Sequence, residues 1–168
     1  MHSTLVFLTG LSGAGKTTIA KRLARILTEK GVPRTRLDGD ELRKGLNSDL
    51  DFSAESRSEN IRRVAEVSKI LLESNTVVIA SFIAPFQKDR DLVKATVGEG
   101  RYLEVFLDTD LEECEKRDPK GLYAKARRGE IKDMTGVSSP YERPTNPDIT
   151  IEQGTSVRDA ARIIYNNL

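Results

Sequence analysis

The stretch from Gly10 to Thr18, GLSGAGKTT, decides the fold of this chain. It fits the pattern G-x-x-x-x-G-K-[ST]. The fixed positions are Gly10, Gly15, Lys16 and Thr17. An apolar run precedes the stretch at residues 5–8, and an amphipathic segment follows it at residues 17–28. This order predicts a strand, a glycine-rich turn and a helix, because apolar runs suit buried strands and apolar residues at helical spacing suit a packed helix.

The residue types in this turn suit the binding of phosphate. Glycines let backbone N–H groups converge on phosphate oxygens, because they adopt dihedral angles that a Cβ forbids. Lys16 can neutralise the β- and γ-phosphates, and the Thr17 hydroxyl can ligate Mg²⁺. A glycine-rich turn that merely happens to carry a lysine is the alternative, but the strand before it and the helix after it favour a P-loop that binds ATP and Mg²⁺. The predicted loop residues are Gly10, Leu11, Ser12, Gly13, Ala14, Gly15, Lys16, Thr17 and Thr18.

Apolar runs alternate with longer amphipathic segments along the whole chain. Strands are expected at residues 5–8, 35–37, 76–82, 102–107 and 149–152. Helices are expected at residues 17–28, 56–74, 88–97, 111–117 and 157–166, the last with Ser156 as its N-cap. Such alternation predicts an α/β fold with a five-stranded parallel sheet and helices on both faces. The length of 168 residues suits a single domain, residues 1–168.

Composition excludes several classes of protein. The net charge of +1 does not suggest a nucleic-acid binder. His2 is the one histidine, at an expected frayed terminus, and Cys114 is the one cysteine, so a Ser-His-Asp or Cys-His triad and an internal disulfide are not expected. No apolar run reaches the length of a membrane span, and the N-terminus lacks the features of a signal peptide. A cytoplasmic protein without nucleic-acid or membrane partners is therefore expected.

Residues 119–147 form the irregular part of the sequence. They are rich in Lys, Arg, Gly and Pro and show no sustained apolar period. A segment of this length without a strand is expected to be a lid, a binding loop or disorder. A basic loop that can wrap a substrate and exclude water favours a small-molecule kinase. A GTPase would need N-K-x-D, which is absent, whereas Asp108 after a strand would also suit a motor-type ATPase.

Two acids flank a glycine where the second expected strand ends, at Asp38, Gly39 and Asp40. The carboxyl ends of parallel strands face the ligand crevice, so these acids can orient hydrated Mg²⁺ or accept a proton from an attacking hydroxyl. The alternative is an ordinary Asp-Gly turn in which Asp40 caps a helix from Glu41. The spacing alone leaves both interpretations open.

The following segment, NSDLDFSAESRSENIRR, also allows two interpretations. Phe52 could stack on a base, Arg57 could pair with an anionic phosphate, and Asn60 could bond to a base edge or a sugar. A helix N-terminus with a solvated, charged face explains the same residues more simply.

Six segments occur in this order along the chain: GLSGAGKTT, LDGDELRKGLNSDLDFS, SRSENIRRVAEVSKIL, SFIAPFQKDRD, RDPKGLYAKARRGEIKDMTG and SPYERPTNPD. Together they resemble the adenylyl-sulfate kinase (adenosine 5′-phosphosulfate kinase) family over most of the chain. Shikimate, gluconate and nucleoside monophosphate kinases share the phosphate loop but not this succession. The resemblance implies a nucleoside-kinase-like P-loop fold, and transfer of the ATP γ-phosphoryl group to the 3′-hydroxyl of adenylyl sulfate, giving 3′-phosphoadenylyl sulfate (PAPS). It also implies a homodimer and suggests a functional link to ATP sulfurylase.

The resemblance assigns roles to individual residues. Lys16, Asp38 and Lys120 would be catalytic, with Asp38 as general base or metal-orienting acid and Lys120 reaching the nucleotide phosphates. Thr17 and Asp38 would hold Mg²⁺. The substrate-binding set would be Asp40, Arg43, Phe52, Arg57, Asn60, Ile83, Ala84, Lys120, Asp133 and Met134. Residues 120–136 would be a mobile lid.

Two positions depart from the family pattern. Many family members have serine at the position of Ala84, and many have Gly-Phe where this chain has Asp133 and Met134. Ala84 cannot form a phosphoserine, so direct transfer from ATP is expected. Asp133 could repel an anionic substrate and could stiffen the lid. A weakly active module that binds PAPS or adenylyl sulfate, and a kinase of another small alcohol, are the alternative functions.

Overall fold

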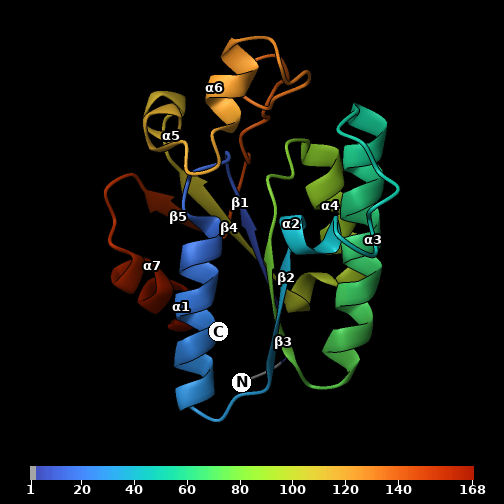
Figure 1. The fold of residues 1–168 in the computed structure, drawn as a ribbon. Helices are drawn as coiled ribbons and strands as arrows, with labels where there is room; N and C mark the ends of the chain where they lie inside the picture. The colour runs from blue at the N-terminus through green and yellow to red at the C-terminus, as the bar shows by residue number, and fades with distance from the viewer. Residues whose placement is uncertain (1–2) are drawn as a thin grey trace.

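The computed structural model describes residues 3–168, so the terminus predicted at His2 lies outside the described residues. These residues form a five-stranded parallel sheet in the order β2-β3-β1-β4-β5 (Figure 1). The strands are β1 (Leu5–Thr9), β2 (Arg34–Asp38), β3 (Val77–Ser81), β4 (Tyr102–Asp108) and β5 (Ile149–Glu152). The α/β fold and the five parallel strands predicted from the sequence are confirmed.

Helices cover both faces of this sheet, with α1 and α7 on one side and α3 and α4 on the other (Figure 1). The helical segments are α1 (Lys16–Glu29), α2 (Gly39–Leu42), α3 (Ala54–Glu73), α4 (Gln87–Val97), the 3₁₀ turn η1 (Glu99–Arg101), α5 (Leu111–Arg117), α6 (Leu122–Arg127) and α7 (Val157–Tyr165). Successive side chains of β1 point to opposite faces, so Val6 and Leu8 pack into the α1 core while Leu5 and Phe7 pack into the α3 core. The N-cap predicted for α7 is also confirmed, because Ser156 Oγ accepts from Asp159 N.

The irregular segment 119–147 differs from its expectation, because it contains α6. The Asp118 carboxylate accepts hydrogen bonds from Tyr123 N and Ala124 N. These bonds satisfy two N–H groups at the start of α6, whose N-cap residue is Gly121, and no apolar period in the sequence indicated this short helix. The capping alternative for Asp40 is likewise wrong: Asp38 is the N-cap of α2 and accepts from Asp40 N.

The carboxyl ends of the strands meet at one edge of the sheet, where α5 and α6 lie in Figure 1. β1 runs directly into Gly10, β2 ends at Asp38, and β3 leads into residues 82–86. Three of the predicted site segments therefore come together although they are far apart in sequence. Within residues 3–168, no helix is both long enough and apolar enough to cross a membrane.

Candidate active site

The phosphate loop has the backbone that its glycines allow. Gly15 has a φ of 101° and forms the left-handed N-cap of α1. Gly13 has a φ of 81°, and a Cβ there would lie 3.1 Å from the Cys114 carbonyl oxygen on α5. A side chain at either position would be strained, because L-residues rarely adopt such dihedral angles. The loop thus closes around the start of α1, where helix N–H groups favour anions.

Lys16 lies inside this loop. Its Nζ donates to the Gly10 carbonyl oxygen at 2.8 Å and to the Leu11 carbonyl oxygen at 2.7 Å. The side chain is buried, and burial lowers the pKa of Lys16 to about 8, an effect to which the nearby charge of Lys120 adds. A desolvated cation held in this way is strongly drawn to an anionic partner.

The phosphate loop contacts the acidic end of β2 directly. Thr17 Oγ1 donates to Asp38 Oδ2 at 2.7 Å, while Asp38 Oδ1 caps α2. One carboxylate oxygen of Asp38 therefore caps α2, and the other faces Thr17 of the phosphate loop. Hydroxyl and carboxylate oxygens are suitable ligands for Mg²⁺. Among residues 3–168 there is no group of three or more His, Cys, Asp or Glu that could hold a metal. This arrangement fits an ion that takes few protein ligands and completes its shell with phosphate and water.

The start of the predicted lid reaches the same edge of the sheet. Lys120 Nζ forms an ion pair with Asp40 Oδ2, and both side chains are about half exposed. Tyr123 Oη donates to the Ser12 carbonyl oxygen at 2.7 Å, so α6 is fastened to the phosphate loop. Gly136 packs against Leu11, since a Cβ at position 136 would lie 3.4 Å from that leucine. The segment therefore covers the phosphate loop, whereas its mobility stays a prediction.

Arg43, Phe52 and Arg57 form a cationic and aromatic cluster. The Arg43 guanidinium lies 4.3 Å from the centroid of the Phe52 ring, and that of Arg57 lies 5.7 Å away. Phe52 is 53% exposed, which is unusual for a phenylalanine and leaves ring surface open to a ligand. Burial lowers the pKa of Arg57, and the nearby charge of Arg43 adds to this effect, whereas the charge of Asp133 opposes it. The cluster suits a ligand that offers both an aromatic ring and negative charge.

Arg57 also joins α3 to the lid. Its Nη2 donates to the Asp133 carbonyl oxygen at 2.6 Å, and its Nε donates to the Phe52 carbonyl oxygen at 2.9 Å. Asp133 has a φ of 57°, a left-handed conformation that costs a non-glycine residue free energy. The next residue, Met134, is buried in the apolar core beside α1. Asn60 is buried too, and its Oδ1 accepts from Asn47 Nδ2 at 2.7 Å.

The tip of β3 is held through its backbone. The Ile83 carbonyl oxygen accepts from Thr9 Oγ1 at 2.6 Å, and the Ala84 carbonyl oxygen accepts from Arg90 Nη1 at 2.5 Å. Ala84 is 2% exposed and has a φ of 46°. These two predicted substrate-lining residues therefore have carbonyl groups that already bond within the protein.

The family model of adenylylsulphate kinases matches residues 2–152. The chain belongs to the adenylyl-sulfate kinase family. It is 52% identical over 157 residues to an adenylyl-sulfate kinase of Bacillus velezensis, a match that covers 94% of this chain and 80% of that one. A solved structure of the adenylyl-sulfate (APS) kinase of Mycobacterium tuberculosis, in complex with AMPPNP and APS, matches with a TM-score of 0.95 and 44% identity, over 98% of this chain and 96% of that one. A hexameric APS kinase from Thiobacillus denitrificans matches 99% of this chain and 29% of its own, with a TM-score of 0.74 and 32% identity.

In this chain, Asp108 does not have the environment expected of the acid in a motor-type ATPase. Both of its carboxylate oxygens accept from the Arg143 guanidinium, at 2.8 and 2.7 Å. Arg143 thus engages both oxygens of the carboxylate that, in a motor-type ATPase, would face the metal and water. The geometry thus agrees with the family assignment.

Three residues at the site were not predicted from the sequence: Thr9, Arg90 and Tyr141. Tyr141 is hydrogen-bonded to Thr9, and Thr9 and Arg90 donate to two successive carbonyl groups at the tip of β3. A signal was present for two of them, because Tyr141 belongs to the family-like segment SPYERPTNPD and Arg90 to the family-like segment SFIAPFQKDRD. Thr9 carried no signal, since it ends an apolar strand.

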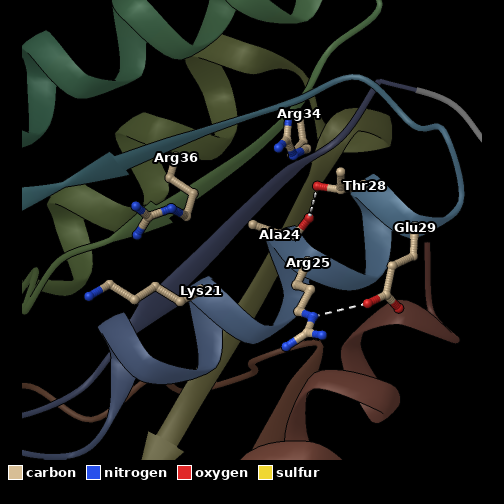
Figure 2. Close-up of a pocket in the computed structure, with 7 residues that line it drawn as sticks. All are labelled: Lys21, Ala24, Arg25, Thr28, Glu29, Arg34 and Arg36. Carbon is tan, nitrogen blue, oxygen red and sulfur yellow. Dashed lines mark hydrogen bonds and ion pairs between the residues drawn. The ribbon is translucent and has the colours of Figure 1, made fainter.

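A groove of about 490 Å³ lies outside this site, between α1 and the edge strand β2 (Figure 2). It is lined by Lys21, Ala24, Arg25, Thr28, Glu29, Arg34 and Arg36. Arg25 pairs with Glu29 at 3.0 Å, whereas no ion pair is found within residues 3–168 for Arg34 or Arg36. Charged side chains on an edge strand oppose pairing with another chain, which explains these arginines without a ligand.

Proposed function

We propose that the protein transfers the γ-phosphoryl group of ATP to the 3′-hydroxyl of adenylyl sulfate, producing PAPS and ADP. The observation that carries this proposal is the 2.7 Å hydrogen bond between Thr17 and Asp38 in a chain of this family. It places an acid of β2 beside the loop that would hold the donor phosphates. A hydroxyl bound at that acid would lie next to the group it attacks.

Catalysis of this transfer is mainly alignment and neutralisation of charge, because the transition state is loose. Lys16 and Lys120 would supply positive charge to the phosphate oxygens. Asp38 would accept the proton of the 3′-hydroxyl or orient the metal. Thr17 and Asp38 would hold Mg²⁺, which when bound neutralises charge on the β- and γ-phosphates.

The acceptor nucleotide would lie on the cluster around Phe52. Phe52 would stack on the adenine, while Arg57 would bind the anionic part. Residues 120–136 would close over both nucleotides and exclude water. The other proposed contacts are Asp40, Arg43, Asn60, Ile83, Ala84, Lys120, Asp133 and Met134.

The transfer would be direct, because Ala84 has no hydroxyl to accept a phosphoryl group. The test is an ATP-dependent assay that compares adenylyl sulfate with AMP and simple alcohols. We expect ADP to form only when adenylyl sulfate is the acceptor, together with PAPS. Turnover of a simple alcohol instead, or a phosphoenzyme that forms and decays as fast as product appears, would contradict the proposal.

A weakly active binding module is the second candidate, and the backbone of Asp133 favours it. The left-handed Asp133 lies at the lid contact with Arg57 and adds negative charge near an anionic ligand. Tight binding of adenylyl sulfate without release of ADP would favour this candidate. Homodimer formation, a functional link to ATP sulfurylase and a cytoplasmic location stay predictions.

Replacement of Arg57 by alanine is expected to weaken the binding of adenylyl sulfate by about 10- to 100-fold, the range for a lost charged hydrogen bond. The affinity should be measured by calorimetry in the presence of ADP and Mg²⁺. Arg62→Ala is the matched control, because Arg62 lies on the same helix and pairs only with Glu59 in the described structure. Equal affinities for wild type and Arg57→Ala would restrict Arg57 to its hydrogen bonds with Phe52 and with the lid.

Binding of ATP is expected to take up protons above about pH 8, where free Lys16 loses its charge. Phosphate oxygens favour the ammonium form, so the pKa of Lys16 rises in the complex. ATP affinity should therefore be highest below about pH 8 and should fall as the pH rises further, by up to roughly tenfold per pH unit. Calorimetry in two buffers of different ionisation enthalpy measures the uptake. The same uptake in Lys16→Met would show that another group titrates.

A further inference from the structure

A relay of hydrogen bonds connects the phosphate loop to the tip of β3. Thr9, the residue before Gly10, donates from Oγ1 to the Ile83 carbonyl oxygen at 2.6 Å. Tyr141 Oη lies 2.9 Å from the same Oγ1. A threonine hydroxyl has one proton, and the Ile83 carbonyl can only accept, so Tyr141 must be the donor to Thr9. The order of donation is therefore Tyr141 to Thr9 to Ile83.

Arg90 braces the next residue of the same tip. The side chain is 1% exposed, and its Nη1 donates to the Ala84 carbonyl oxygen at 2.5 Å. Its Nη2 donates to the Glu142 carbonyl oxygen at 2.6 Å, and its Nε lies 3.1 Å from Glu104 Oε1. A buried cation is costly unless it is well bonded, so these partners hold Arg90 in one place. Ala84 has a left-handed φ of 46°, which persists only where surrounding contacts enforce it.

The segment that carries Tyr141 is itself fixed through the next residue, Glu142. Glu142 N donates to the Pro85 carbonyl oxygen at 2.8 Å, and Gln87 N donates to Glu142 Oε2 at 2.7 Å. The Tyr141 ring stacks on Phe106 of β4, with centroids 6.1 Å apart. The relay is thus tied to β1, β3 and β4, which lets it fix the distance between the donor and acceptor sides of the site.

We propose that Thr9, Tyr141 and Arg90 are positioning residues, which hold the acceptor loop, residues 82–86, at a set distance from the phosphate loop. This inference rests on the proposed phosphoryl transfer, in which the acceptor loop lines the site of adenylyl sulfate. The three side chains act through the carbonyl groups of Ile83 and Ala84. A shift of about 1 Å between reacting groups is enough to cost about 100-fold in rate, so small losses of support should reach the chemistry.

Thr9→Val tests the relay, because it removes the hydroxyl and keeps the shape of the side chain. We expect kcat to fall by about 10- to 100-fold and the KM for ATP to stay within about twofold. The midpoint of thermal unfolding should fall by a few degrees, because Tyr141 Oη and the Ile83 carbonyl each lose a buried partner. Thr9→Ser retains the hydroxyl and should restore most of kcat. Thr96→Val is the matched control, because the Thr96 hydroxyl also donates to a backbone carbonyl, that of Leu92 at 2.8 Å, on the exposed side of α4. It should leave kcat unchanged.

A wild-type kcat in Thr9→Val, or a loss that Thr9→Ser fails to restore, would overturn the inference. So would a fall in kcat that is matched by an equal fall in ATP binding, since that marks a purely structural role. If Thr9→Val does not fold, Tyr141→Phe removes the donor and keeps the ring, with the same expected outcomes.

A second measurement separates this inference from the proposed function. Hydrogen exchange of the backbone amides of residues 82–84 and of Phe86 should be faster in Thr9→Val than in wild type, whatever the substrate is. A wild-type protein that does not phosphorylate adenylyl sulfate refutes the proposed function alone. Unchanged exchange in Thr9→Val, with an active wild type, refutes the relay alone.

Discussion

Replacement of Lys16 by alanine should lower kcat by about 10³-fold, which corresponds to about 4 kcal/mol of transition-state stabilisation. Lys16 is the buried cation of the phosphate loop, and its Nζ already points at two loop carbonyl oxygens. Its desolvated charge interacts more strongly with phosphate than an exposed charge would. A coupled assay of ADP release at saturating ATP and adenylyl sulfate measures the effect.

The control for this variant is Lys21→Ala, one turn further along α1, where the side chain is exposed at the groove of Figure 2. It should keep wild-type kcat. Lys16→Met is a second variant that fills the space of the lysine stem, and thermal unfolding shows whether either variant is folded. Near-normal turnover by a folded Lys16→Ala protein would refute the role of the phosphate loop.

Replacement of Asp38 by asparagine should lower kcat by about 10²- to 10⁴-fold, the usual contribution of general acid–base catalysis, and should raise KM less. The carboxylate has two functions in the structure: it accepts from Thr17 Oγ1 and caps α2 through Asp40 N. Asparagine caps a helix about as well as aspartate, so the change removes the charge and keeps the cap.

Steady-state kinetics with each substrate varied in turn measures both constants. Asp159→Asn is the matched control, because Asp159 is exposed in the first turn of α7, far along the chain from the site. An increase in KM with unchanged kcat would reassign Asp38 to substrate binding. Wild-type values for both constants would remove Asp38 from the site.

The sequence determined the elements and their class, because each signal was local. The phosphate loop is set by glycines and a lysine at fixed spacing, and its backbone has the left-handed angles that these glycines permit. The strands that are buried on both faces, β1, β3 and β4, were predicted from apolar runs, whereas the edge strand β2, with the sequence RTRLD, gave only a weak signal. Helix α6 was not predicted, because its first N–H groups bond to a single side chain, Asp118, and no apolar period accompanies it.

Only the tertiary structure decided how the parts of the site meet. The sequence offered Asp38 and Asp40 as active-site acids or as a turn in which Asp40 caps a helix. The fold showed that Asp38 is the cap and that its second oxygen faces Thr17, because β2 ends beside Thr17. The relay from Tyr141 through Thr9 to Ile83 joins residues 132 and 74 positions apart. No local pattern encodes such contacts, since they exist only once the carboxyl ends of parallel strands converge at one edge of the sheet.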